Sequence, residues 1–291
     1  LLNSGAAIVD EDTKYIHWNE EYKNIELSIK EFQKIRSCAL YGKLMAYEDA
    51  KGEVNAIIWN FPAKIFKVFR EVYILTYLFK GQLQKYYFDL HGIKYNFKSV
   101  KEVDNKYCLV DYKDRIPLNK NLIKRLINLY DDIGSQDKYK PNDMERSLSF
   151  NACTKNAKIA KPMLKRLSKD AYNVFQNVFK AKKDEVMWTM YVDAIKKFKF
   201  NIKGYRGYVD TDNPNCFIAH NARATNNYRN RSTVGYLIER NLDNTYKYFF
   251  RSNNVDVDED IWRLSEMIQF IWRSAIRENN PINLYIPSKN K

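Results

Sequence analysis

Two arginines and a glutamine share one face of an expected helix near the end of the chain. Apolar side chains recur at a helical spacing over residues 261–278, which predicts one helix over that range. On a second face, Gln269, Arg273 and Arg277 follow one another at intervals of four residues. Guanidinium groups one turn apart can hold a polyphosphate through forked hydrogen bonds, and an arginine aimed at a γ-phosphoryl group stabilises its transfer. The alternative is that both arginines are merely exposed to solvent on the surface of the helix and bind nothing.

A second group of polar side chains lies in a loop that follows an expected strand over 216–219. In open α/β sheets, ligands bind beyond the carboxyl ends of the strands, so amides, hydroxyls and guanidiniums at this place can contact phosphates. With Gln269, the candidate nucleotide contacts are Asn221 and Arg223, and the candidate nucleic-acid contacts are Thr225, Asn226, Arg229 and Arg231. An ordinary turn-rich loop is the alternative, although three arginines are many for a turn alone.

A third group stands near the start of the chain, where the short apolar run 6–9 leads directly into Asp10 and Glu11. Many nucleoside triphosphatases present a carboxylate that orients Mg²⁺ and a second that polarises the attacking water in this way. The pattern therefore predicts Asp10 as a magnesium ligand and Glu11 as a catalytic base. A strand followed by acidic residues also occurs often by chance, which is the competing interpretation.

The positive charge of the chain is concentrated in one segment. The 291 residues carry a formal net charge of +14, and residues 155–206 alone hold 14 Lys and Arg against 4 acids, a net charge of +10. Such a density favours a polyanionic partner, with Lys165 and Arg166 as candidate contacts to a nucleic-acid backbone. Aromatic residues are interleaved with the lysines and could stack on bases, although burial in the core is the preferred interpretation.

Strands that alternate with helices must position these groups, and this order predicts an α/β fold with a mainly parallel sheet. Strands are expected at 72–78, which reads as buried, and at 282–286, a strand or the start of a helix at 185–190, and helices at 118–130, 232–241 and 261–278. Residues 145–206 should form a basic helical segment. No apolar run approaches the roughly 20 residues that span a bilayer. Four isolated cysteines without a Cys-x-x-Cys pair are typical of a reducing compartment, so we expect a cytoplasmic protein that binds no membrane.

Taken in order, these segments resemble the motifs of a known enzyme family. Residues 220–238 are similar to motif V, and residues 267–277 to motif VI, of superfamily-two (DEAD-like) helicases of phages and mobile elements. Residues 69–79 resemble motif III, which makes Thr76 a candidate nucleic-acid contact, and Asp10 with Glu11 would form motif II. The resemblance implies RecA-like domains that clamp ATP and Mg²⁺ between them while nucleic acid lies across both. Arg273 and Arg277 would then act on the γ-phosphate.

Two departures from that family limit what the chain could do by itself. No Gly-x-x-x-x-Gly-Lys-Ser/Thr phosphate loop is present, since Gly42 and Lys43 are followed by Leu44. The interval between Arg273 and Arg277 is also one residue longer than in the usual motif VI. The first departure predicts that this chain alone does not hydrolyse ATP, and the second puts the role of Arg277 in doubt more than that of Arg273.

These observations predict the C-terminal portion of an ATP-dependent helicase or translocase that acts in phage or mobile-element replication or recombination. Residues 1–90 would be the end of an incomplete first RecA-like domain, and residues 91–291 the second. The expected partner is single-stranded or duplex nucleic acid, DNA rather than RNA. A non-catalytic nucleic-acid-binding module with a helicase-like shape is the alternative. The oligomeric state is left open by the sequence.

Overall fold

The computed structural model divides the chain into two compact units. It describes residues 1–27, 29–48, 51–59, 61, 63–114, 119–130, 148–205, 207, 215–222 and 225–288. One unit combines residues 1–95 with 242–258, and the other combines residues 96–241 with 259–291. The boundary that the sequence suggested, after residue 90, falls near the first crossing between the units. Residues 242–258 also belong to the first unit, which nothing in the sequence pattern indicated.

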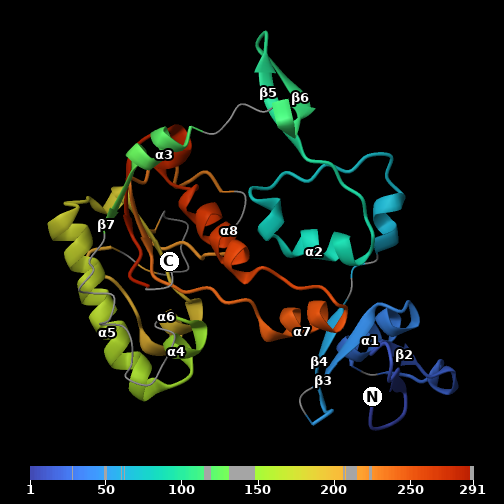
Figure 1. Ribbon diagram of the computed structural model, residues 1–291. Helices are drawn as coiled ribbons and strands as arrows, with labels where there is room; N and C mark the ends of the chain where they lie inside the picture. Colours follow the sequence, from blue (N-terminus) through green and yellow to red (C-terminus); the bar gives the residue numbers. More distant parts are fainter. Residues whose placement is uncertain are drawn as a thin grey trace. The chain divides into compact units, whose positions relative to one another are not determined.

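A parallel sheet forms the centre of the second unit (Figure 1). Its strands are β7 (Ile127–Tyr130), β8 (Val186–Thr189), β9 (Thr233–Tyr236) and β10 (Ile282–Tyr285), in the order β7-β10-β9-β8. All three pairings are parallel, and Phe217 adds a parallel bridge to Trp188 on the outer side of β8. The fold is therefore mixed α/β with a parallel sheet, as the sequence predicted.

Helices cover both faces of this sheet. The helices of the unit are α3 (Lys120–Leu126), α4 (Phe150–Thr154), α5 (Ala157–Asn173), α6 (Val192–Phe198) and α8 (Glu259–Ile271). Phe175, in the π-turn that follows α5, lies against Gly235, whereas Phe270 of α8 contacts Tyr236 with ring centroids 5.5 Å apart. Successive residues of a strand point to opposite faces, so α5 and α8 pack on opposite sides of β9 (Figure 1).

Gly235 permits the close approach on the α5 side. A Cβ atom placed there would lie 2.7 Å from Cζ of Phe175 and 3.1 Å from Cβ of Trp188. Both of these side chains are completely buried, so neither can move aside into solvent. The sheet thus depends on the absence of a side chain at this position.

Two expected helices are strands in the structure. The predicted helix 118–130 ends at Leu126, after which residues 127–130 form β7, and the predicted helix 232–241 contains β9. A strand of a parallel sheet is buried on both faces, so its apolar run lacks the alternation that marks a half-exposed strand. Short runs of this kind cannot be told from a buried helix by periodicity, which explains both errors. The strand expected at 282–286 is confirmed as β10.

The helix expected over 261–278 is shorter than predicted, since α8 ends at Ile271. The hydroxyl of Ser274 donates to the carbonyl of Ile271 at 2.6 Å, and the backbone N–H of Ala275 donates to the carbonyl of Arg231 at 2.9 Å. These two bonds replace the continuing helical ladder, because serine competes for backbone groups and a neighbouring segment offers an acceptor. A separate 3₁₀ turn, η8 (Ala275–Glu278), holds Arg277.

The first unit consists of hairpins and short helices. Its elements are β1 (Ala7–Val9), β2 (Ile16–Trp18), η1 (Glu20–Tyr22), α1 (Lys30–Leu40), β3 (Leu44–Glu48), β4 (Val54–Trp59), η2 (Ala63–Lys67), η3 (Phe79–Gly81), α2 (Leu83–Leu90) and α7 (Asn244–Ser252). The strands form two antiparallel pairs, β1 with β2 and β3 with β4. The buried strand expected at 72–78 is wrong, because this segment forms no strand and Leu75 is 90% exposed.

A separate antiparallel hairpin, β5 (Lys98–Val103) with β6 (Lys106–Asp111) followed by η4 (Tyr112–Asp114), begins the second unit. The short turn η7 (Lys183–Glu185) precedes β8. Among the residues that the structure describes, no helix has both the length and the apolar character needed to cross a membrane.

Candidate functional site

Helix α5 presents a row of lysines on its outer face, which we call the lysine stripe: Lys158, Lys161, Lys165 and Lys169. The helix begins at Asn156, whose side chain accepts a hydrogen bond from the N–H of Lys158 at 3.1 Å. Its opposite face is buried on the sheet through Met163, Leu164 and Leu167. That burial fixes the rotation of the helix, and all four lysines are consequently exposed.

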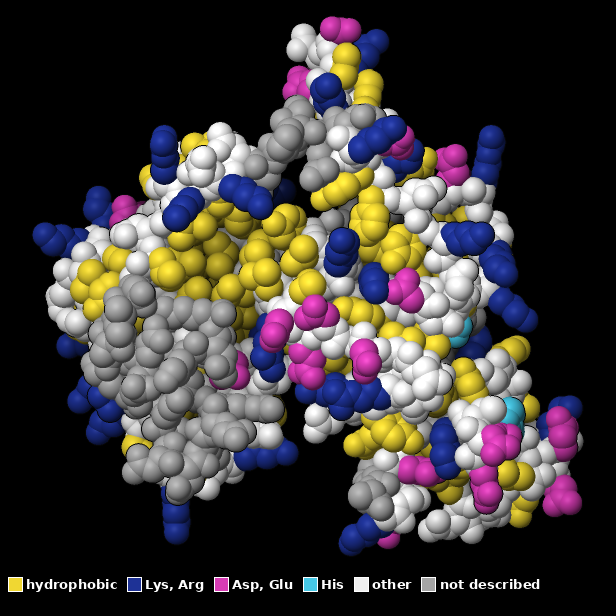
Figure 2. Space-filling view, in the orientation of Figure 1, with side chains coloured by type: hydrophobic (Ala, Val, Ile, Leu, Met, Phe, Trp, Pro, Cys, Tyr) yellow, Lys and Arg dark blue, Asp and Glu magenta, His cyan; other side chains and the backbone are white. Residues whose placement is uncertain are grey.

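The lysine stripe is a compact array of positive charge. Its members follow at intervals of three, four and four residues, which keeps them within one face of a helix. At 1.5 Å per residue, the stripe extends over about 16 Å. Arg166 lies beside it, with its Nε atom 3.9 Å from a carboxylate oxygen of Asp170. In Figure 2, basic side chains project from the side of the molecule where Figure 1 draws α5.

The aromatic residues of the same segment belong to the core. Phe175 and Trp188 have no exposed surface, and Tyr191, Phe200 and Tyr205 are also buried. The interpretation of these aromatics as core residues is therefore confirmed. The lysine stripe can contact a phosphate backbone, but these rings cannot stack on its bases.

The described parts of the loop that resembles motif V, residues 220–222 and 225–231, lie at opposite ends of the sheet. His220 follows the bridge at Phe217 and lies at the carboxyl ends of the strands, as does the exposed Asn221. Residues 225–231 lead into β9 and therefore lie at the amino ends. Arg223 lies outside the described residues. The loop thus places its candidate residues at two different edges of the sheet.

At the amino ends of the strands, a hydrogen bond connects the segment that resembles motif V with the segment that resembles motif VI. Nη1 of Arg277 donates a hydrogen bond to Oδ1 of Asn226 at 2.7 Å, although the two residues are 51 positions apart. The hydroxyl of Thr225 accepts from the N–H of Asn227 at 3.4 Å. Arg229 is exposed.

Two of the predicted arginines are buried instead. Arg231 is 5% exposed and donates from Nη1 to the carbonyl of Lys183 at 3.2 Å. Arg273 is 8% exposed, and its guanidinium lies 5.7 Å from the ring centroid of Phe270. Gln269 donates to the hydroxyl of Ser265 at 3.1 Å. Because α8 ends before Arg273, the expected common face of Gln269, Arg273 and Arg277 is absent.

Asp10 lies in the tight turn between β1 and β2. Its Oδ1 atom accepts from the N–H and the hydroxyl of Thr13, each at 2.7 Å, and these bonds hold the pKa of Asp10 below its usual value. Glu11 is exposed in the same turn, and Thr76 is exposed in the segment without regular structure. The described residues hold no group of three or more His, Cys, Asp or Glu side chains that could bind a metal ion. As arranged, the Oδ1 atom of Asp10 stabilises its own turn.

A pocket that the sequence did not indicate lies at the carboxyl edge of the sheet. It has a volume of about 510 Å³ and lies among the ends of β9 and β10 and the first turns of α8. Its lining includes Ile238, Glu239, Arg240, Arg263, Ile286 and Ser288. We call it the edge pocket. The carboxyl ends of parallel strands are the usual place for ligands in α/β folds.

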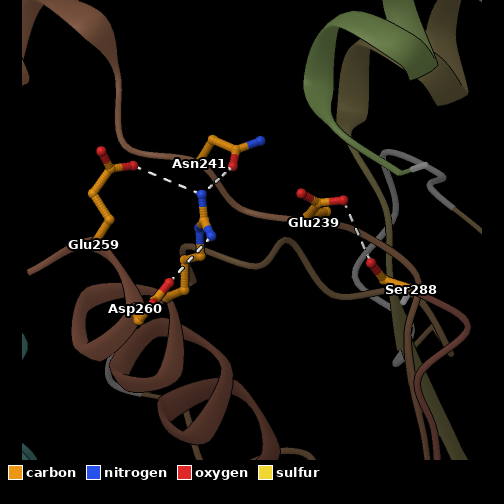
Figure 3. Close-up of polar contacts among 6 residues, drawn as sticks. Glu239, Asn241, Glu259, Asp260 and Ser288 are labelled. Atoms are coloured by element: carbon orange, nitrogen blue, oxygen red, sulfur yellow. Dashed lines mark hydrogen bonds and ion pairs between the residues drawn. The ribbon is translucent and has the colours of Figure 1, made fainter. Parts of the chain in front are cut away.

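The polar groups of the edge pocket form two separate sets of contacts (Figure 3). Arg263 donates to Oδ1 of Asn241 at 2.8 Å and pairs with Asp260 at 3.3 Å and Glu259 at 3.7 Å. Deeper inside, the hydroxyl of Ser288 is 3.5 Å from Oε2 of Glu239, which is 3% exposed. A buried carboxylate at the end of a central strand is thus held beside a hydroxyl.

Arg240 links this pocket to the motif V-like loop. Its Nη1 atom is 2.7 Å from Nε2 of His220, and its Nη2 atom is 3.7 Å from Glu266. The guanidinium also lies 5.2 Å from the ring centroid of Trp262. Each arginine of the edge pocket therefore already has a carboxylate partner, which leaves the pocket nearly balanced in charge.

Burial disfavours the charged forms of two groups, the hydroxyl of Tyr236, which lines the edge pocket, and the thiol of Cys153. Burial raises the pKa of the Tyr236 hydroxyl and raises the pKa of the Cys153 thiol to about 12. A thiol with that pKa stays protonated at neutral pH and is a poor nucleophile. The edge pocket thus provides hydrogen bonds and shape rather than a reactive sulfur atom.

Sequence reasoning missed the edge pocket because it placed residues 232–241 in a helix. Once β9 is recognised, Glu239 and Arg240 follow the carboxyl end of a buried strand, which is the position that marks a ligand site. Ser288 holds the equivalent place after β10.

The parallel sheet covered by helices on both faces, with a pocket at the carboxyl ends of its strands, defines a Rossmann-like α/β protein. Residues 121–290 match the family model of the YonV C-terminal Rossmann-like domain, and the chain belongs to this family.

One relative extends the similarity to nearly the whole chain. The SPbeta prophage-derived protein YonV of Bacillus subtilis (strain 168) is 33% identical over 289 residues, which cover 99% of this chain. The chain spans 63% of the length of that relative. No solved structure matches the chain.

Proposed function

We propose that this chain is a nucleic-acid-binding protein of phage origin that holds a sugar–phosphate backbone along the lysine stripe. The observation that supports the proposal is the exposure of Lys158, Lys161, Lys165 and Lys169 on one face of α5. The prophage origin of the YonV relative supports a role in phage or mobile-element DNA, so DNA is the preferred partner over RNA.

The charge around the stripe favours a polyanion. Residues 155–206 carry a net charge of +10, and the four lysines of the stripe are exposed whereas most of the interleaved aromatics are buried. Lysines that neutralise phosphates release condensed counterions, which gives affinity without sequence preference. We therefore expect binding that tolerates any sequence and weakens as salt rises.

A direct test compares two variants with the same change of charge. In the first, all four lysines of the stripe are replaced by glutamine. In the matched control, glutamine replaces four exposed lysines outside the basic segment: Lys30, Lys34, Lys106 and Lys113. Anisotropy of a labelled single-stranded oligonucleotide should show a loss of about tenfold or more for the stripe variant at low salt. Equal affinities of the two variants would refute the stripe as the binding surface.

The second candidate is the ATP-dependent helicase or translocase that the motif resemblance implies, acting in the full-length protein. One observation favours it: the hydrogen bond between Arg277 and Asn226 joins the segments that resemble motifs VI and V. This function requires ATP and Mg²⁺, whereas backbone binding requires neither.

Its test uses the full-length protein with Asn226→Ala and Arg277→Ala, separately and together, and measures ATP hydrolysis with saturating single-stranded DNA. The helicase or translocase function would be supported if each single variant lost ATP turnover, the double variant lost no more than the single variants, and DNA binding stayed unchanged. Wild-type protein that hydrolyses no ATP would refute it and leave the binding proposal intact.

A further inference from the structure

An aromatic pocket occupies the first unit, well apart in sequence from the lysine stripe. It has a volume of about 490 Å³, and eight of the eleven residues that line it are aromatic. Strand β4, the turn η2 and the helices α2 and α7 supply its walls, all within one compact unit. A volume of this size admits a small planar ring system.

Several rings at this pocket remain open to solvent. Trp59 is 55% exposed, Tyr246 48% and Phe61 41%. The plane of Phe61 is tilted by 87° from that of Trp59 and by 57° from that of Phe66, so neighbouring rings meet at an angle and not face to face. Ring faces of this kind are available for a planar guest to stack on.

The elements that form the pocket carry positive charge at its margins. Turn η2 contains Lys64 and Lys67, helix α7 contains Lys247 and Arg251, and neither element contains an acidic residue. On α2, Lys85 is paired with Asp89 at 2.7 Å. Aromatic faces flanked by cations are the combination that binds single-stranded nucleic acid, whose bases stack while its phosphates lie near the cations.

We infer that the aromatic pocket of the first unit binds exposed bases of single-stranded nucleic acid by stacking on Trp59 and Tyr246. The inference rests on the proposed function and narrows its substrate class to nucleic acid with unpaired bases. Bases within a duplex are already stacked on one another and cannot enter. The pocket and the lysine stripe lie in different units, so each can be altered without the other.

The test replaces both rings in Trp59→Leu/Tyr246→Leu and compares this variant with Tyr41→Leu/Tyr107→Leu, which alters two exposed tyrosines that do not line the pocket. Affinity for an oligothymidylate and for a blunt duplex is measured by anisotropy, and circular dichroism checks the fold. Stacking on an aromatic side chain contributes about five- to 150-fold per base. We expect at least a fivefold loss of oligothymidylate affinity in the pocket variant, with duplex affinity unchanged. The control should match wild type.

Other outcomes separate this inference from the proposed function. If the lysine-stripe variant loses binding while the pocket variant keeps wild-type affinity for oligothymidylate, the pocket inference is overturned and the backbone proposal stands. Equal losses for single strand and duplex in the pocket variant would also overturn it, as would an apolar peptide that occupies the pocket without competition from oligothymidylate. Wild-type protein that binds no nucleic acid would overturn both.

Discussion

Replacement of Gly235 by alanine tests the packing that orients the lysine stripe. The new Cβ atom would lie 2.7 Å from Cζ of Phe175 and 3.1 Å from Cβ of Trp188, distances that real Cβ contacts do not tolerate without movement. Both neighbours are fully buried in the core of the second unit. Overpacking of this kind costs about 1–3 kcal/mol, which for a unit of this size lowers Tm by roughly 2–12 °C.

The sign of the change in stability of Gly235→Ala shows whether a Cβ atom at this position meets a close neighbour or open space. A glycine in an open strand position is less stable than alanine by about 0.5–1 kcal/mol, so without the close approach Gly235→Ala would raise Tm. Thermal and urea unfolding of the variant give the sign and the size. The double variant with Phe175→Leu provides the control, because removal of the ring should relieve the clash and make the two changes non-additive by about 0.5–3 kcal/mol. A stabilised alanine variant, or strictly additive effects, would refute the packing of the π-turn after α5 on β9.

Two further predictions concern arginines and a histidine. Arg231→Ala should destabilise the second unit by about 1–3 kcal/mol in urea unfolding, because it removes a buried donor to the carbonyl of Lys183. The control, Arg229→Ala, alters an exposed arginine and should leave the free energy of unfolding within about 0.5 kcal/mol of wild type. Equal effects of the two substitutions would contradict the buried role of Arg231. His91 is an exposed residue, but partial desolvation of its ring, which lies 4.3 Å from the ring of Tyr87, lowers its pKa below the usual 6.5. The folded state therefore binds this proton less readily than the unfolded chain, and stability should fall slightly as pH drops below about 6.5. His91→Gln should reduce that fall in unfolding experiments between pH 7 and pH 5, and an unchanged pH profile would contradict it.

The spacing of apolar and charged residues is enough to predict an element that has one buried and one exposed face. The lysines and the buried Met163 and Leu167 alternate at a helical period, so the sequence alone indicates the orientation of α5. The hairpin of β3 and β4 likewise pairs two strands that lie close together along the chain. In each case one short stretch contains all the information that fixes the element.

Tertiary contacts explain what the sequence could not indicate. Residues 127–130 and 233–236 are strands only because they join a sheet whose other members lie far along the chain. Helix α8 stops at Ile271 because Arg231, 44 positions before Ala275, offers its carbonyl to that residue. The edge pocket was missed for the same reason, since Glu239 is recognisable as a site residue only after β9 is known.

The salt dependence of DNA binding tests the central claim most directly. Neutralisation of each phosphate of a single strand contributes about 0.7 to the slope of log K against log salt concentration, so the four lysines of the stripe should contribute about 2.8. Measured between 50 and 200 mM salt, the slope of the variant with glutamine at Lys158, Lys161, Lys165 and Lys169 should therefore be smaller in magnitude than that of wild type by about 3. Slopes that coincide would show that the lysine stripe does not contact the nucleic-acid backbone.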